Sequence, residues 1–133
     1  MPHLLGRVLV ADDDEPIRRL ICVNLELEGF TVEEATDGRE CLAMAWADPP
    51  DVITLDLVMP NLDGLATAAR LRTDSRTRDV PIVLLTGAAT PHDRARADAI
   101  GVDVFLAKPF LPGVLVAAVY SLADRVRTSP NTR

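Results

Sequence analysis

Carboxylates, one hydroxyl and one ammonium are the side chains of this sequence whose spacing could support chemistry. The run VLVADDDEP places Asp12 and Asp13 directly after four apolar residues, and the apolar run DVITLDL carries Asp56 near its end. The run PIVLLT ends on Thr86, and FLAKPF contains Lys108. Each of these groups therefore follows or ends a segment that has the composition of a buried strand.

Such a cluster of carboxylates would need a cation or a function to justify it. Two carboxylates about 4 Å apart repel by roughly 4 kcal/mol at an effective dielectric constant near 20. Clustered carboxylates form a hard oxygen site of the kind that Mg²⁺ accepts, with room left for waters and a phosphate group. A carboxylate beside the metal could accept a phosphoryl group, and Lys108 and Thr86 could hold its oxygens. Lys108 is the only lysine among fourteen basic residues, which indicates a site where an ammonium rather than a guanidinium matters.

The elements that must position these groups alternate regularly along the chain. Apolar runs predict five strands, over residues 7–11, 30–35, 51–57, 81–86 and 103–107. Helical patterns follow each strand, over residues 16–28, 38–48, 64–72, 91–100 and 112–127. Strand and helix in regular alternation favour a parallel sheet covered by helices on both faces, and ligands of such sheets bind where the strands end. The acidic residues, Thr86 and Lys108 should therefore converge at one edge.

Several local patterns refine this picture. Asp14 and Thr90 are predicted to be the N-caps of the first and the fourth helix. Cys22 and Cys41 are predicted to be buried thiols without a disulfide. The core face of the first helix is predicted to hold Ile17, Leu20, Ile21 and Leu25. The last helix shows a core stripe of Leu115, Ala118, Leu122 and Val126, and a second apolar stripe of Val116, Tyr120 and Ala123. The second stripe predicts a homodimer or partner surface on this helix.

Composition narrows the class of protein. At 133 residues the chain suits a single domain with a proper core, and 48% hydrophobic with 26% charged residues is typical of globular proteins. The net charge of −6 argues against direct binding of nucleic acid or of a membrane surface. The first apolar run breaks on aspartates rather than continuing as a secretory signal, and no apolar segment reaches the ~18 residues of a membrane span. We therefore expect a cytoplasmic protein.

Together these motifs resemble the receiver domain of the two-component response regulator family. The resemblance covers residues 7–127 and is carried by the acidic pair of VLVADDDEP, the segment DLVMPNLDG, the threonine of VLLTG and the KPF of FLAKPF. It implies a flavodoxin-like, doubly wound α/β fold, with a five-stranded parallel sheet in the order 2-1-3-4-5 and five helices. Residues 128–133 would form a polar C-terminal tail.

The resemblance also implies a role for each residue of the site. Asp56 would be the phosphoacceptor, and would ligate Mg²⁺ together with Asp13 and the backbone carbonyl of Val58. Asp12 would contact the metal through a water.

Around the phosphoryl group, Lys108 would pair first with Asp56 and then with the phosphoryl oxygens. Thr86 would move toward the same group, and Phe105 would occupy the aromatic switch position and turn inward as Thr86 moves. The chain would not be an enzyme in its own right but a signalling protein that assists its own phosphorylation and dephosphorylation.

The partners implied are a sensor histidine kinase or histidine phosphotransfer protein, and a downstream effector or fused output domain. His3 and His92 are predicted to be surface residues rather than phosphodonors. A non-phosphorylated pseudo-receiver that only binds proteins remains an alternative. So does a haloacid-dehalogenase-like phosphatase, because Asp12 and Asp14 imitate its nucleophile and acid, although only Asp124 follows Lys108 where that family expects an acidic pair.

Overall fold

The computed structural model describes residues 5–87 and 89–128, and the side chains of this part as far as Arg125. Its strands are β1 (Arg7–Ala11), β2 (Thr31–Ala35), β3 (Val52–Asp56), β4 (Ile82–Thr86) and β5 (Val104–Ala107). Its helices are α1 (Glu15–Glu28), α2 (Gly38–Ala47), α3 (Gly64–Arg72), α4 (Pro91–Ile100) and α5 (Pro112–Thr128). All ten predicted elements are present, and none of their ends differs from the predicted one by more than one residue.

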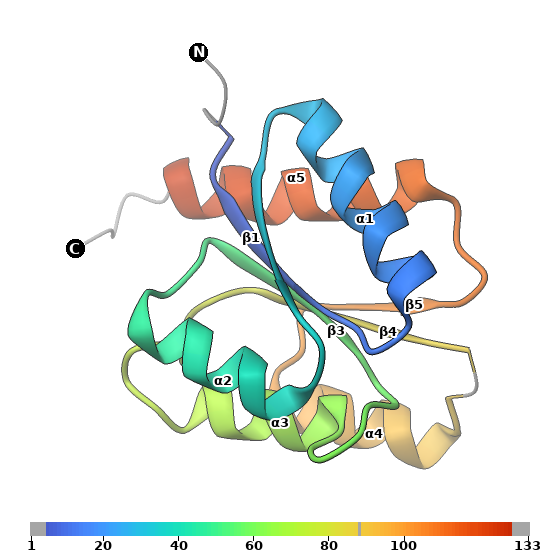
Figure 1. Ribbon diagram of the computed structural model, residues 1–133. Coiled ribbons are helices and arrows are strands. Elements are labelled where there is room, and N and C mark those ends of the chain that lie inside the picture. The colour runs from blue at the N-terminus through green and yellow to red at the C-terminus, as the bar shows by residue number, and fades with distance from the viewer. Residues whose placement is uncertain (1–4, 88, 129–133) are drawn as a thin grey trace.

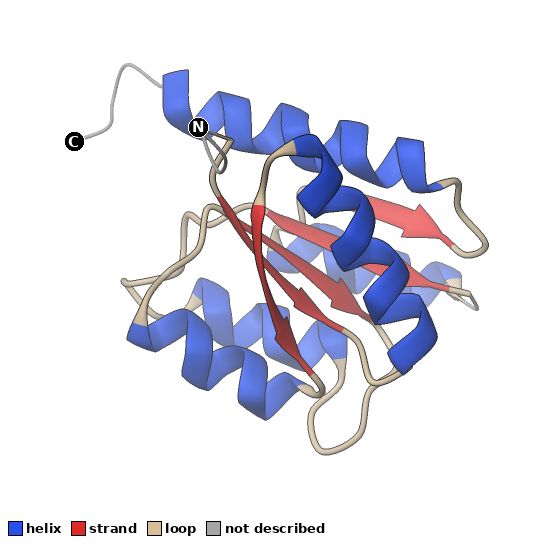
Figure 2. Cartoon of the chain, turned by 45° about the horizontal axis from the view of Figure 1, so that its top comes forward, coloured by secondary structure: helices blue, strands red, loops and turns tan. Residues whose placement is uncertain are grey.

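The five strands form one parallel sheet in the order β2-β1-β3-β4-β5, which confirms the predicted doubly wound α/β fold. Helices α1 and α5 cover one face of the sheet, and α2, α3 and α4 cover the other (Figure 1). The same three layers, and the common direction of the strand arrows, can be followed in Figure 2. All five residues of β3 and of β4 are buried, as expected for central strands with helices on both sides.

Short polar side chains are the N-caps of four helices, and they define where the preceding loops end. Asp14, Asp37 and Asp63 cap α1, α2 and α3 by accepting a hydrogen bond from the first turn. Thr90 and Asp93 form a reciprocal capping box at the start of α4, with bonds of 3.0 and 3.1 Å. The predicted N-caps Asp14 and Thr90 are confirmed.

Two predictions about helix faces are wrong in part. Leu20 is 48% exposed, and Cys22 takes its place in the core beside Ile21 and Leu25. On α5 the residues Val119 and Ala123 are buried, so Ala123 belongs to the core rather than to a second stripe. Apolar spacing on a helix predicts a face about 100° wide, but the sheet and the neighbouring helix decide which edge of that face is covered.

Both cysteines are buried and free, as predicted, and burial raises the pKa of each thiol to about 12. Among the described helices, none is long and apolar enough to cross a membrane. The side chain of Val126, the residue His3 and residues 129–133 of the predicted tail lie outside the described part of the chain.

Candidate functional site

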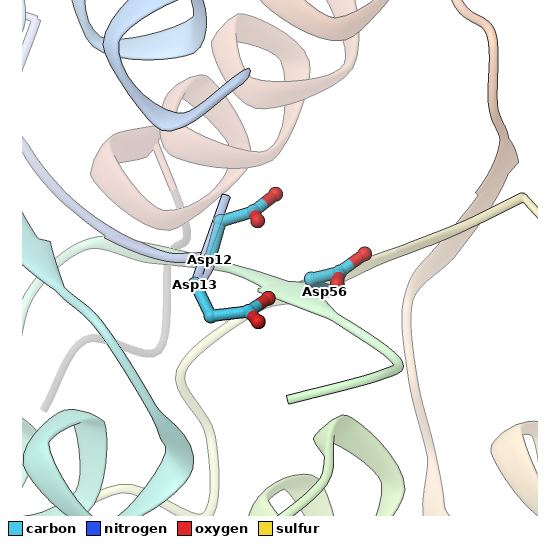
Figure 3. A group of neighbouring side chains, drawn as sticks. All are labelled: Asp12, Asp13 and Asp56. Atoms are coloured by element: carbon cyan, nitrogen blue, oxygen red, sulfur yellow. The ribbon is translucent and has the colours of Figure 1, made fainter. Parts of the chain in front are cut away.

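Three carboxylates gather where β1 and β3 end side by side. Asp12 and Asp13 follow β1, and Asp56 is the last residue of β3 (Figure 3). One oxygen from each of the three lies within 4.8 Å of the others. Asp12 and Asp56 are buried, with only 1% and 6% of their surfaces exposed, whereas Asp13 is exposed. The predicted convergence of the acidic residues is therefore present in the fold.

Lys108 reaches this cluster from the strand at one edge of the sheet. It follows β5, and its Nζ lies 2.7 Å from Oδ1 of Asp56 and 3.5 Å from Oδ2 of Asp12. Thr86, at the end of the intervening strand β4, is 2% exposed. The ends of four adjacent strands thus supply the acids, the hydroxyl and the ammonium predicted from sequence.

The charges of this cluster are not balanced. Burial raises the pKa of Asp12 and that of Asp56 above the usual carboxyl value, although contacts with Lys108 act in the opposite direction. Burial also opposes the charge on Lys108, but its hydrogen bond to Asp56 and the nearby charge of Asp12 prevail and raise the pKa of Lys108. One ammonium therefore faces three carboxylates.

These residues fit a small divalent cation. The donors are hard carboxylate oxygens, which Mg²⁺ and Ca²⁺ prefer, and the described cluster contains neither a thiol nor an imidazole. Because one donor, Asp13, is exposed, the site is also open on its outer side to waters and to a phosphoryl group.

The loop after β1 is held by its own acidic residues. The backbone N–H of Asp14 donates to Oδ1 of Asp12 at 2.9 Å, and that of Asp12 donates to the carbonyl of Ala35 at 3.1 Å. The side chain of Asp14 in turn accepts from the N–H of Ile17, at the start of α1. Asp14 is thus engaged as a helix cap and is not one of the three clustered carboxylates, an arrangement that does not favour the paired acids of a phosphatase.

The loop after β3 carries Val58, whose side chain is 69% exposed. The N–H of Gly64 donates to the carbonyl of Leu57 at 2.8 Å, and a β-carbon at Gly64 would overlap the carbonyl oxygen of Asp56. Asn61 adopts a left-handed backbone with φ of 68° and donates to Asp37, the N-cap of α2, at 2.6 Å. Sequence reasoning missed Asn61 and Gly64, although an Asn and a Gly between an apolar strand and a helix are signals for such backbone shapes.

The predicted switch residues lie on the β4–β5 side of the site. Phe105 is half-buried, and the guanidinium carbon of Arg94 on α4 stands 4.6 Å from the centre of its ring. A cavity of about 460 Å³ opens beside them, with Thr86, Thr90, Arg94 and Phe105 in its lining. The contact of Arg94 was not predicted, because spacing along one helix carries no information about a ring on another element.

Comparisons with known proteins agree with this geometry. The family model described as response regulator receiver domain matches residues 8–120. The DNA-binding dual master transcriptional regulator RpaA of Synechocystis is 39% identical over 126 residues, 95% of this chain and 52% of that protein. The phosphate regulon transcriptional regulatory protein PhoB of Escherichia coli is 37% identical over 120 residues, 90% of this chain and 52% of that protein.

Solved structures give the same result. The signal receiver domain of a histidine kinase from Syntrophus aciditrophicus superposes with a TM-score of 0.87 at 30% identity, covering 96% of this chain and 97% of that one. The chemotaxis response regulator CheY4 of Vibrio cholerae gives 0.82 at 34% identity, covering 88% and 98%.

The chain belongs to the receiver domain family of two-component response regulators, the signalling proteins of phosphorelays. It spans about half the length of the curated relatives it matches.

Proposed function

We propose that the chain accepts a phosphoryl group on Asp56 from a phosphohistidine of a sensor kinase or a histidine phosphotransfer protein. The observation that carries this proposal is the contact of 2.7 Å between Lys108 Nζ and Asp56 Oδ1, inside a cluster of three carboxylates. An ammonium so placed can hold the ionised carboxylate before transfer and a phosphoryl oxygen after it.

The transfer is a displacement at phosphorus. A carboxylate oxygen of Asp56 forms the new P–O bond, and the P–N bond to the donor histidine breaks with its electron pair passing to the imidazole nitrogen. Asp56 must be ionised to attack, and Lys108 favours that state against the opposing effect of burial. Because phosphoryl transfer depends mainly on positioning and charge, the hydroxyl of Thr86 and the ammonium of Lys108 would then bind the phosphoryl oxygens.

Asp13, Asp56 and the backbone carbonyl of Val58 would hold Mg²⁺ directly, and Asp12 would do so through a water. A bound Mg²⁺ would supply positive charge for the phosphoryl oxygens. The proposal is supported by the grouping of the three carboxylates and by their excess of negative charge over Lys108.

Phosphorylation would be communicated through Thr86 and Phe105. Thr86 would move toward the new phosphoryl group, and Phe105 would turn inward to fill space beside it. The cavity that these two residues line is consistent with such a movement. The surface that changes would be the one formed by α4 and β5, because Phe105 belongs to β5 and contacts Arg94 of α4.

The output would be a changed contact with an effector protein or a fused output domain. RpaA is described as DNA-binding, and PhoB as a transcriptional regulatory protein. Any such activity would belong to a part of the whole protein other than this domain, whose net charge of −6 disfavours direct contact with nucleic acid. A homodimer through α5 stays a prediction, now resting on Val116 and the 47% exposed Tyr120.

The test is incubation with acetyl phosphate and Mg²⁺, followed by intact-mass and peptide mass spectrometry. We expect one phosphoryl adduct that is absent from Asp56→Asn and present in Asp98→Asn, a control that changes an exposed aspartate on α4. A native chain without an adduct would identify a pseudo-receiver. An adduct on Asp12 would instead revive the phosphatase alternative.

A further inference from the structure

Arg18 forms a polar bridge between three elements beside the acidic cluster. Its Nε donates to Oε1 of Glu34 on β2 at 2.8 Å, and its Nη1 donates to the backbone carbonyl of Asp12 at 2.8 Å. Its side chain is only 11% exposed, although it lies in the first turns of α1. A guanidinium held this deeply by two acceptors has one fixed position.

We propose that Arg18 is a positioning residue for the divalent cation site, because it fixes the peptide from which Asp13 projects. This inference rests on the metal site of the proposed function. The carbonyl that Arg18 holds belongs to the planar peptide unit joining Asp12 to Asp13. Fixing the oxygen of that plane therefore fixes the direction in which the chain enters Asp13.

Asp13 needs this support more than the other two acids do. Asp12 is held through its N–H, through Oδ1 by Asp14 and through Oδ2 by Lys108. Asp56 lies at the end of a buried strand and pairs with Lys108. Asp13 is exposed and makes no hydrogen bond or ion pair through its side chain to the described residues. Only its backbone keeps its carboxylate in the cluster.

Glu34 orients Arg18, and it also binds the neighbouring Arg19, which serves as the control. Its second oxygen, Oε2, accepts from Nη1 of the neighbouring Arg19 at 2.7 Å. Arg19 is 53% exposed at its side chain, and within the described part of the chain it makes no hydrogen bond to Asp12. The two adjacent arginines therefore have the same carboxylate partner and carry the same charge. They differ in that only Arg18 holds the peptide of Asp12.

The two arginines allow positioning to be separated from charge. Loss of either positive charge near an acidic cluster should, by Coulomb's law alone, strengthen the binding of a cation. Loss of the bond to the Asp12 carbonyl should weaken it, because groups that orient metal ligands typically contribute about 10-fold to 100-fold in affinity. The sign of the change thus distinguishes the two effects.

The experiment is a titration of the purified chain with Mg²⁺, with the dissociation constant obtained from the backbone amide chemical shifts of Asp13 and Asp56. We expect Arg18→Met to weaken Mg²⁺ binding about tenfold. Arg18→Lys should recover part of the loss, since an ammonium can reach only one of the two acceptors well. Arg19→Met should stay within about twofold of the native chain or bind slightly more tightly.

Each result bears on the inference. Equal or tighter Mg²⁺ binding by a folded Arg18→Met variant would overturn it, as would an equal weakening in Arg19→Met. Should Arg18→Met not fold, Arg18→Gln takes its place, because it removes the same positive charge and is expected to weaken Mg²⁺ binding in the same direction. If the native chain binds no Mg²⁺, the metal site of the proposed function is overturned. If the native chain binds Mg²⁺ and Arg18→Met binds it equally well, only the role of Arg18 is overturned.

Discussion

Replacing Asp56 by asparagine should stabilise the metal-free protein, although it removes the proposed phosphoacceptor. At an effective dielectric constant of 20, the pair formed by Lys108 and Asp56 at 2.7 Å attracts by about 6 kcal/mol. Asp12 lies within 4.8 Å of Asp56 and repels it by at least about 3.5 kcal/mol, and Asp13 adds a smaller repulsion because water screens its exposed carboxylate. Attraction and repulsion therefore nearly cancel.

The cost of burying the charge then decides the sign. Transfer of a carboxylate into a protein interior costs several kcal/mol, and Asp56 is only 6% exposed. Burial is also the main cause of the raised pKa of Asp56. We expect Asp56→Asn to increase the free energy of unfolding by about 1 kcal/mol or more, which is roughly a 4 °C rise in melting temperature for a domain of this size.

The assay is thermal and urea unfolding of both chains, with a chelator and then with Mg²⁺. At neutral pH the variant should be the more stable without metal, and Mg²⁺ should stabilise the native chain more than the variant. Because the folded pKa of Asp56 is raised above 3.8, the advantage of the variant is complete above that folded pKa. It should shrink as the pH falls through this value and vanish below 3.8. An Asp56→Asn variant that is less stable than the native chain in chelator at pH 7 would refute this reasoning.

Four further substitutions test other parts of the structure by urea unfolding. Lys108→Met should destabilise the metal-free chain by about 3 kcal/mol, because it leaves the acidic cluster without its ammonium; a loss below about 1 kcal/mol would contradict this. Gly64→Ala should cost about 1–3 kcal/mol, because its β-carbon would overlap the Asp56 carbonyl. Gly113→Ala, which meets nothing within 4 Å in α5, should instead gain up to about 1 kcal/mol. Thr54→Val should stabilise by about 1 kcal/mol, because the buried Thr54 hydroxyl has no hydrogen-bond partner among the described residues; a loss of stability would show that it is satisfied.

The parts of the fold that were predictable from sequence depend on local rules. A carboxylate or hydroxyl before a helix identified the caps Asp14 and Thr90, and buried apolar runs identified the strands. The convergence of Asp12, Asp56 and Lys108 then followed from topology, because parallel strands bring their carboxyl ends to one edge.

What sequence could not predict depends on long side chains that cross between elements. Arg18 reaches Glu34 across sixteen residues, and Arg94 lies over Phe105 of a different element. Neither partner is at a helical or strand spacing, so no periodicity indicates the pair. The exposed position of Leu20 is of the same kind, since it depends on how far the neighbouring elements extend over α1.

The buried strands and the long side chains that cross between elements together explain how the fold holds an unfavourable cluster of carboxylates. Two of its acids are buried at the ends of strands in which nine of ten residues are buried, so the apolar core stabilises the sheet against their repulsion. Lys108 offsets part of that repulsion from a strand two places away, and the N–H of Asp14 and the guanidinium of Arg18 hold the loop in which the acids would otherwise move apart. The remaining negative charge is what a divalent cation would neutralise, and the charge of that cation would in turn favour a phosphoryl group. The acidic cluster is thus expected to lower the free energy of unfolding of the metal-free domain. Asp56→Asn tests this by removing one negative charge, which should raise that free energy. Lys108→Met tests it by removing the positive charge, which should lower it.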